Sequence, residues 1–266
     1  MILIKNGRII DPHSKRDEVV DIVIRDNKIL KIGKCSLTDE YEKVIDASGC
    51  IVAPGLIDVH VHFRDPGFTH KEDIETGSKS AAKGGFTTVV CMANTNPIVD
   101  NEETLEYIKE KAKTSPINVL QACAITKGFK GKELVDMKYL KECGAVGFTD
   151  DGLPIMDSDV IYNAMLKAKE LDVPLSFHEE NPSLITNNGV NHGKASNYYN
   201  IEGSPRSAEI DMIYRDLEIA KDLDAPIDIQ HISTKEGVEL VRQAKLEMIQ
   251  KPNLPLPLPK IKEELT

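Results

Sequence analysis

The chain has 266 residues, of which 41% are hydrophobic, and its formal net charge is −10 at pH 7. This acidic balance, without any cluster of Lys and Arg, argues against a nucleic-acid partner, and no apolar run approaches the ~20 residues that cross a bilayer. Five cysteines without CxxC spacing, and a first segment with no basic region before a long apolar core, indicate a chain of the reducing cytoplasm without a signal peptide.

Residues 1–53 consist of short segments in which polar and apolar residues alternate, separated by turn pairs such as Asn-Gly and Ser-Gly. Alternation over such short runs predicts antiparallel strands joined by tight turns. We therefore expect a small β domain over residues 1–53, with a sandwich-like arrangement.

From Pro54 onward, apolar runs that predict strands alternate with polar stretches that predict helices. The strands are expected to end near His62, Met92, Ala124, Thr149, His178 and Ser233. The first five of these ends are separated by 30, 32, 25 and 29 residues, which is room for one helix each time. This spacing predicts successive βα units of a TIM-like (β/α)8 barrel, of which about six lie within residues 54–250.

The fifth unit is expected to carry a long insertion after His178 that is rich in Asn, Gly and Ser. Loops of this length are either functional lids or plain surface elaborations, and composition leaves both open. In the tail, residues 251–266, the string LPLPLP forbids a central strand and the interior of a helix. We therefore expect an incomplete barrel followed by a tail that adds no further unit.

Two histidines, His60 and His62, stand one residue apart at the predicted end of the first barrel strand. Side chains of a strand alternate between its faces, so the two imidazoles point to the same side. The carboxyl ends of barrel strands carry the active site, and imidazole is a common zinc ligand. A core role is the alternative for a single strand histidine, but this pair predicts metal ligation.

Two further strands end in histidines, His178 and His231, so that four of the seven histidines occupy strand ends. Four neutral imidazoles can hold two divalent ions only if an anionic ligand lies between the cations and offsets their repulsion. The fourth strand ends in Asp150 and Asp151, which supply such a carboxylate. Adjacent side chains diverge, so we expect only one of them to reach the metals, whereas shaping the turn before Gly152 is the alternative role.

The strings DVHVHFRDPG, CMANTNP, GFTDDG, FHEE and QHIST together resemble the amidohydrolase superfamily, and most closely type I dihydroorotases, from the first residues to about Lys245. The resemblance implies two zinc ions per chain. By it, His60 and His62 would bind one ion, His178 and His231 the other, and Asp151, rather than Asp150, would bridge them.

The same resemblance implies a substrate site for dihydroorotate and N-carbamoyl-L-aspartate, whose reversible interconversion belongs to pyrimidine biosynthesis. Arg64 and Asn94 match the positions that bind the substrate carboxylate, and a guanidinium is suited to this by its two parallel hydrogen bonds. Two residues beyond His62, Arg64 is expected on the same face of the chain. A salt bridge between Arg64 and either Asp65 or Glu72 is the alternative.

The family's catalytic acid/base, an aspartate at the end of the eighth strand, has no match after His231, so we assign no catalytic residue. A truncated enzyme, a non-catalytic scaffold beside aspartate transcarbamoylase, and a barrel completed by another subunit, including a homo-oligomer, are the readings left open. A hydantoinase- or allantoinase-like cyclic amidase is the alternative activity, and it would not depend on Arg64.

Overall fold

The computed structural model describes residues 1–35, 40–187 and 189–249. It divides the chain into two compact units, the first comprising Met1–Leu56 and the second beginning at Ile57. None of the helices in these described ranges combines the length and the apolar character needed to cross a bilayer.

The first unit is built on one five-stranded sheet. Its strands are β1 (Ile2–Asp11), β2 (Arg16–Arg25), β3 (Lys28–Ile32), β4 (Lys43–Asp46) and β5 (Ile51–Val52). The strand order is β3-β2-β1-β4, and β5 also pairs with β1. Leu3, Ile22 and Val23 are buried, so the small core of this unit lies along β1 and β2.

Two expectations for this unit need correction. The strands β1, β2 and β3 pair antiparallel as predicted, but β4 and β5 run parallel to β1. A tight turn can join only antiparallel neighbours, and neither β4 nor β5 follows β1 directly along the chain, so their parallel pairing with β1 needs no such turn. The sandwich-like arrangement is not seen either, since residues 1–35 and 40–56 form a single sheet.

The carboxylate of Asp46, at the end of β4, offers a test of this unit. It accepts hydrogen bonds from Ser48 Oγ (2.6 Å) and Asn6 Nδ2 (3.2 Å), which lower the pKa of Asp46 from 3.8 to about 2. A depressed pKa means that the ionised carboxylate stabilises the fold above pH 3.8 and that this contribution is lost as the pH falls toward 2. Ser48→Ala should raise the pKa of Asp46 toward 3.8 in a carboxyl NMR titration. The pKa of Asp11, which Ser14 lowers, should not change, and an unmoved Asp46 would contradict the assignment.

The second unit is an alternation of strands and helices, as the spacing of apolar runs predicts. Its strands are β6 (Leu56–Val61), β7 (Phe86–Cys91), β8 (Asn118–Gln121), β9 (Leu175–Phe177) and β10 (Ile227–Ile229). Its α-helices are α1 (Ile74–Lys83), α2 (Glu102–Ala112), α3 (Met137–Glu142), α4 (Ser158–Leu171), α5 (Lys194–Tyr199), α6 (Ser207–Leu223) and α7 (Lys235–Ile249). Short 3-10 helices occupy η1 (Lys127–Phe129) and η2 (Pro182–Leu184).

Phe148 joins the strands of this unit into one continuous series. The sheet β6-β7-β8 and the pair β9-β10 are separate, but Phe148 forms parallel bridges to Cys123 on one side and to Leu175 on the other. The predicted fourth strand is therefore reduced to an isolated bridge. The sixth strand ends at Ile229 instead of Ser233, because His231 adopts a φ of +30° that an extended strand does not allow.

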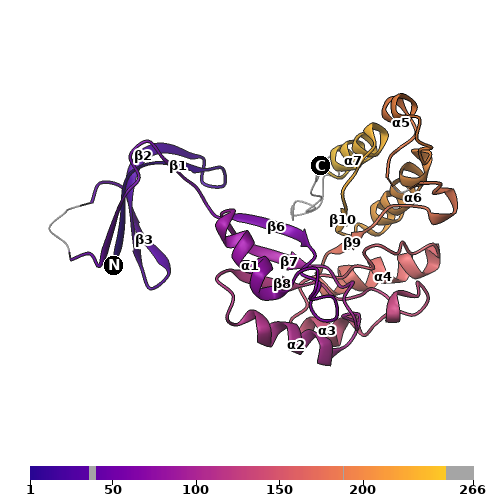
Figure 1. Ribbon diagram of the computed structural model, residues 1–266, viewed down its shortest axis with the longest axis horizontal. Coiled ribbons are helices and arrows are strands. Elements are labelled where there is room, and N and C mark those ends of the chain that lie inside the picture. The colour runs from indigo at the N-terminus through magenta and orange to yellow at the C-terminus, as the bar shows by residue number, and fades with distance from the viewer. Residues whose placement is uncertain (36–39, 188, 250–266) are drawn as a thin grey trace. The chain divides into compact units, whose positions relative to one another are not determined.

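The helices begin where the sequence places capping residues. The side chains of Asp73, Asn101 and Asp157 accept hydrogen bonds from backbone N–H groups at the starts of α1, α2 and α4. Helix α1 packs against β7 and α2 against β8, whereas α6 contacts both α4 and α7 (Figure 1). The first two units thus place their helices beside the strands of the sheet.

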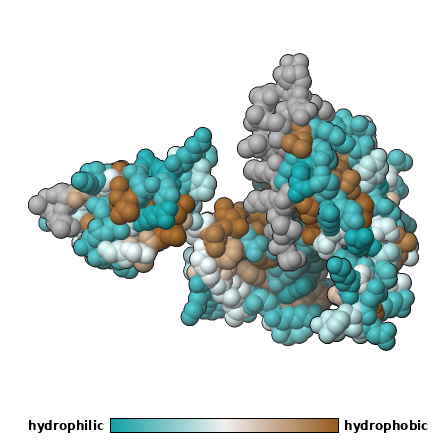
Figure 2. All heavy atoms as spheres, turned by 90° about the horizontal axis from the view of Figure 1, so that it is seen from above, coloured by the Kyte–Doolittle hydropathy of each residue, from teal (hydrophilic) through white to brown (hydrophobic). Residues whose placement is uncertain are grey.

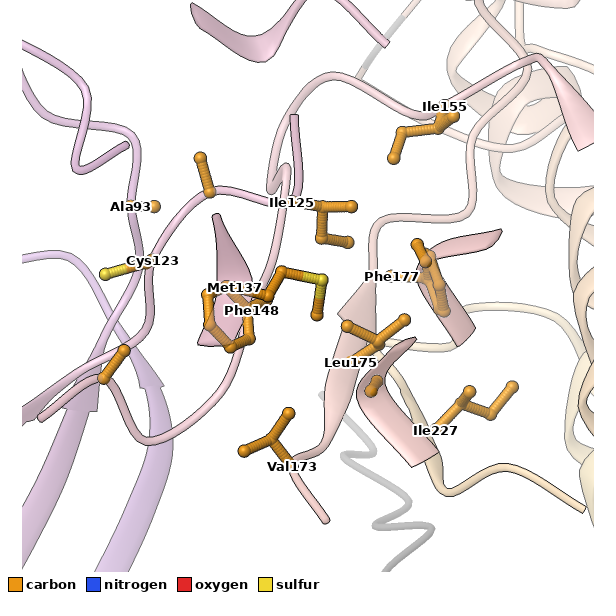
Figure 3. Close-up of a cluster of buried hydrophobic side chains, with 14 of the residues drawn as sticks. Ala93, Cys123, Ile125, Met137, Phe148, Ile155, Val173, Leu175, Phe177 and Ile227 are labelled. Atoms are coloured by element: carbon orange, nitrogen blue, oxygen red, sulfur yellow. The ribbon is translucent and has the colours of Figure 1, made fainter. Parts of the chain in front are cut away.

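The core of the second unit gathers side chains from the strand region and from the helices around it. Phe148, Leu175 and Ile227 are at most 2% exposed and lie in one cluster (Figure 3). Met137 of α3 and Ile155 join this cluster (Figure 3). Hydrophilic side chains cover much of the surface between scattered apolar ones (Figure 2).

The insertion after β9 is not a structureless loop, since it contains η2 and α5, and Asn191 bridges to Ser204.

Candidate metal centre

Four histidines and one aspartate from different strand ends lie side by side in the second unit. His60 belongs to β6 and His62 follows it, while His178 directly follows β9 and His231 lies shortly after β10. The ring centroids are 5.0 Å apart for His60 and His62, 5.5 Å for His60 and His231, and 4.7 Å for His178 and His231. Residues up to 171 positions apart in the sequence therefore form one cluster, with Asp151 among them.

Asp151 occupies the middle of this cluster. Its Oδ1 lies 3.6 Å from His60 Nε2 and 3.5 Å from His178 Nδ1, and its Oδ2 lies 3.6 Å from His62 Nε2. Two groups of ligand atoms result, one from His60, His62 and Asp151 and the other from Asp151, His178 and His231, each with its atoms within 4.8 Å of one another. The two groups share only the aspartate.

These distances fit the residues to divalent metal ions. Donor atoms bound to Zn²⁺ at about 2.0–2.1 Å lie roughly 3.3 Å apart at the corners of a tetrahedron. The Nε2 atoms of His60 and His62 are 3.1 Å apart. Nδ1 of His178 is buried and has no hydrogen-bond partner in the described ranges, although such a buried atom normally has one. A cation between His178 and Asp151 would satisfy both groups.

A family model described as "Dihydro-orotase-like" matches residues 49–237 of the chain. The chain belongs to this dihydro-orotase-like family. A dihydroorotase of Clostridioides difficile is 66% identical over 245 residues, which make up 92% of this chain and 58% of that protein. A dihydroorotase of Clostridium acetobutylicum is 55% identical over the same shares of the two chains. The chain thus spans 58% of the length of these relatives.

Solved structures of hydantoinases share the fold. An L-hydantoinase from Arthrobacter aurescens superposes with a TM-score of 0.78 at 24% identity, covering 93% of this chain and 56% of that one. A D-hydantoinase from Thermus sp. has a TM-score of 0.71 at 28% identity, with the same coverage. These likenesses confirm the predicted fold class, a TIM-like barrel that is incomplete over the described residues, and the family match confirms the resemblance seen in the sequence.

In this dihydro-orotase-like chain Asn94 holds two of the candidate ligands. Its Oδ1 lies 3.0 Å from His62 Nδ1, and its Nδ2 donates to Asp151 Oδ2 at 2.7 Å. If Nδ1 of His62 carries the proton for this contact, Nε2 presents its lone pair to the cluster, as metal ligation requires. The sequence led us to expect Asn94 at the substrate carboxylate. In the structure its amide contacts two candidate metal ligands, and only one of the two N–H groups of Nδ2 is needed for the bond to Asp151.

The structure distinguishes the two adjacent aspartates of the family motif. Asp150 accepts hydrogen bonds from the backbone N–H groups of Ile125 (2.7 Å) and Thr126 (3.0 Å) and from Thr126 Oγ1. Burial raises the pKa of Asp150 to about 6, although these bonds oppose the shift. Asp151 faces the histidines instead, and they lower its pKa below the ordinary value despite its burial. Of the pair, Asp151 therefore has the position expected of a bridging ligand.

The pKa shifts of His60 and His178 have opposite directions. Burial lowers the pKa of His60 to about 4, so its ring is neutral near pH 7. Burial also lowers the pKa of His178, but the carboxylates of Asp151 and Glu180 outweigh it and raise that pKa above the ordinary value. The carboxylate that favours the protonated form of His178 would also attract a metal cation, and the ring binds that cation after it has lost its proton.

Sequence analysis missed a buried acidic group behind His178. Glu179 is 4% exposed, and burial together with the nearby Asp216 raises its pKa well above the ordinary value. Asp216 on α6 accepts from Arg215 Nε at 2.6 Å and from its second nitrogen at 3.1 Å. The string FHEE contains Glu179, but only the fold brings α6 against it, so the sequence carries no signal for the contact.

Glu209 of α6 is a second residue that sequence analysis missed. Its carboxylate accepts from Ser233 N (2.7 Å), Ser233 Oγ (3.0 Å) and Thr234 N (2.8 Å). These bonds fasten the segment just after His231, whose φ of +30° is rare for a residue other than glycine. Glu209 thus holds the backbone that presents one of the candidate ligands.

Arg64 is half-buried, and in the described ranges its side chain makes no hydrogen bond or ion pair. The alternative of a salt bridge with Asp65 or Glu72 is not seen, since Asp65 bonds to Tyr107 and Lys111, and Glu72 accepts from Thr76 Oγ1 and Asp73 N. The alternation argument that placed Arg64 on the face of His62 does not apply, because β6 ends at Val61 and Arg64 has a φ of +59°.

Proposed function

We propose that this chain supplies the metal centre of a cytoplasmic zinc-dependent dihydroorotase, which interconverts N-carbamoyl-L-aspartate and dihydroorotate in pyrimidine biosynthesis. The observation that carries the proposal is the carboxylate of Asp151 shared by two histidine pairs. The names of two similar curated relatives support this substrate, and the 245 residues matched at 66% and 55% identity span the segments that bear the cluster.

The five residues of the cluster would bind about two zinc ions, as is typical of two-metal sites. His60 and His62 would hold one ion, His178 and His231 the other, and Asp151 would touch both. Zinc supplies Lewis acidity toward a carbonyl oxygen and lowers the pKa of a water molecule. Asn94 orients His62 and Asp151 for this task through its two hydrogen bonds.

Arg64 is the candidate for the carboxylate that both substrates carry. A guanidinium binds a carboxylate through two parallel, charge-assisted hydrogen bonds, which also orient the ring. The absence of any ion pair on Arg64 in the described ranges leaves its charge available for this purpose. No residue in those ranges is assigned as the acid/base that must serve the ring nitrogen.

Metal analysis and ligand binding test this function. The chain loaded with zinc and dialysed should retain about two ions, measured by mass spectrometry of the metal. By titration calorimetry it should then bind dihydroorotate, and Arg64→Met should weaken this binding by about 10-fold or more while leaving the neutral ring dihydrouracil unaffected. Retention of no zinc, or equal binding of dihydroorotate to both chains, would reject the proposal. Turnover of dihydroorotate is a separate readout, because it also needs the unassigned acid/base.

Partners beyond the small-molecule substrate are part of the same proposal. The sequence left open two such partners, aspartate transcarbamoylase and a second copy of this chain, and either would bind to the surface of the chain in a stable complex. Light scattering after size-exclusion chromatography, with and without the transcarbamoylase, distinguishes these states, and a monomer in both samples would remove both partners.

A further inference from the structure

The residue after Arg64 is a buried carboxylate with two partners on helix α2. The side chain of Asp65 is 1% exposed, its Oδ1 accepts from Tyr107 Oη at 3.0 Å, and its Oδ2 pairs with Lys111 Nζ at 2.9 Å. The Lys111 ammonium also lies 4.9 Å from the centre of the Tyr107 ring. Tyr107 and Lys111 are four residues apart, so one face of α2 holds both groups against Asp65.

These contacts of Asp65 bear on whether the guanidinium of Arg64 can bind a ligand. A buried carboxylate without a partner is costly, and the guanidinium of the preceding residue is an available counter-ion. A guanidinium engaged by such a carboxylate would lose the donors with which it binds a ligand. Because α2 satisfies Asp65, the carboxylate has no need of Arg64, and Arg64 makes no ion pair in the described ranges.

The backbone of this segment is fixed on its other side as well. Asn96 N donates to Pro66 O at 3.1 Å, and Phe68 N donates to Arg64 O at 2.9 Å. Gly67 has a φ of +92°, and a Cβ built on it would stand 2.1 Å from Asn96 O, so only glycine allows this close approach. The turn that carries Arg64 is thus held between the loop after β7 and helix α2.

We propose that Tyr107 and Lys111 are positioning residues that hold Asp65 away from Arg64, and that they thereby make the site selective for ring substrates bearing a carboxylate. The inference rests on the proposed function for the identity of that ligand, but the state of the Arg64 guanidinium follows from the contacts of Asp65 alone. Without the α2 donors, Asp65 is expected to capture Arg64.

Chemical modification of arginine tests the first half of the inference without any activity. Lys111→Met and the double variant with Tyr107→Phe should slow the reaction of Arg64 with phenylglyoxal about 5-fold or more, followed by peptide mass spectrometry, because an ion-paired guanidinium reacts less readily. The exposed Arg16 and Arg242 serve as internal references. Lys113→Met is the matched control, since Lys113 is the C-cap residue of the same helix, is 68% exposed and pairs with Glu110. In this variant Arg64 should react at the wild-type rate.

Removal of the carboxylate separates positioning from simple damage to the fold. Adding Asp65→Asn to Lys111→Met should restore the wild-type reaction rate of Arg64, because no charge remains to capture it. A purely structural role for Lys111 predicts that the second substitution restores nothing. In Lys111→Arg, which keeps the positive charge, Arg64 should react at the wild-type rate. If Lys111→Met does not fold, a changed rate of Arg64 in Lys111→Arg would contradict the inference.

Ligand selectivity tests the second half. In the zinc-loaded chain, Lys111→Met should weaken dihydroorotate binding by about 10-fold, which corresponds to the loss of one charge-assisted contact, and should leave dihydrouracil binding unchanged. Unaltered Arg64 reactivity in Lys111→Met overturns the inference whatever the ligand. If the reactivity changes as expected but the wild-type chain does not bind dihydroorotate, then the proposed function fails and the positioning role stands.

Discussion

Replacing Asp151 by asparagine is expected to reduce the zinc content of the chain from about two ions to one or none. The carboxylate belongs to both candidate ligand groups, so a single substitution removes one ligand from each. It also removes the negative charge that offsets the repulsion between two cations a few ångströms apart. Loss of a residue that only hydrogen-bonds a metal ligand costs about 10- to 100-fold in metal affinity, so loss of this ligand itself should cost at least about 100-fold.

The measurement is a competition titration of zinc against a chromogenic chelator, with Asp157→Asn as the control. That variant makes the same change of charge six residues away, and the side chain of Asp157 caps α4 by accepting from Asp159 N and Val160 N. Asparagine caps helices as well as aspartate does, so the control should keep both its stability and its zinc. Two tightly bound ions in the Asp151 variant would show that the carboxylate does not bridge them.

Arg215→Met is expected to lower the free energy of unfolding by about 3–5 kcal/mol, the cost of removing one partner of a buried ion pair. Arg215 donates twice to the buried carboxylate of Asp216 and also to the carbonyl oxygens of Ile155 (3.0 Å) and Met156 (3.2 Å). Without it, Asp216 and the neighbouring Glu179 would share a buried space with no cation. Methionine has a similar length but supplies no donor.

Urea denaturation followed by circular dichroism measures this loss, with Arg242→Met as the matched control. Arg242 is 53% exposed and pairs with Glu239 one helical turn away on α7, so its removal should cost no more than about 0.5 kcal/mol. Equal unfolding midpoints and slopes in the two variants would show that the pair of Arg215 and Asp216 is not needed to balance the buried charge.

The residues of the candidate site could be predicted because they stand in short, local sequence patterns. His60 and His62 are separated by one residue at the end of a strand, and this spacing alone predicts both rings on one side of the chain. His178 follows a short apolar run, and the pair Asp150 and Asp151 precedes a glycine. Parallel strands deliver their carboxyl ends to a common edge, so each pattern could be assigned to the same place before any coordinates.

The tertiary structure decided what depends on partners from other segments. Asp150 and Asp151 are indistinguishable as sequence, and only the donors on Ile125 and Thr126 show which of them turns away from the histidines. Asn94 lies 57 residues from Asp151 in the sequence, and no local pattern predicts their hydrogen bond.

By itself, therefore, the sequence determined the series of βα units, the family and the residue types at the strand ends, because periodicity and spacing are local properties of the chain. Only the fold decided the parallel pairing of β4 with β1 and the contacts of Asp65 with α2, beside which Arg64 has no ion pair in the described ranges. The physical reason is that a hydrogen bond or an ion pair depends on distance in space, and Asp65 meets Lys111 across 46 positions of sequence.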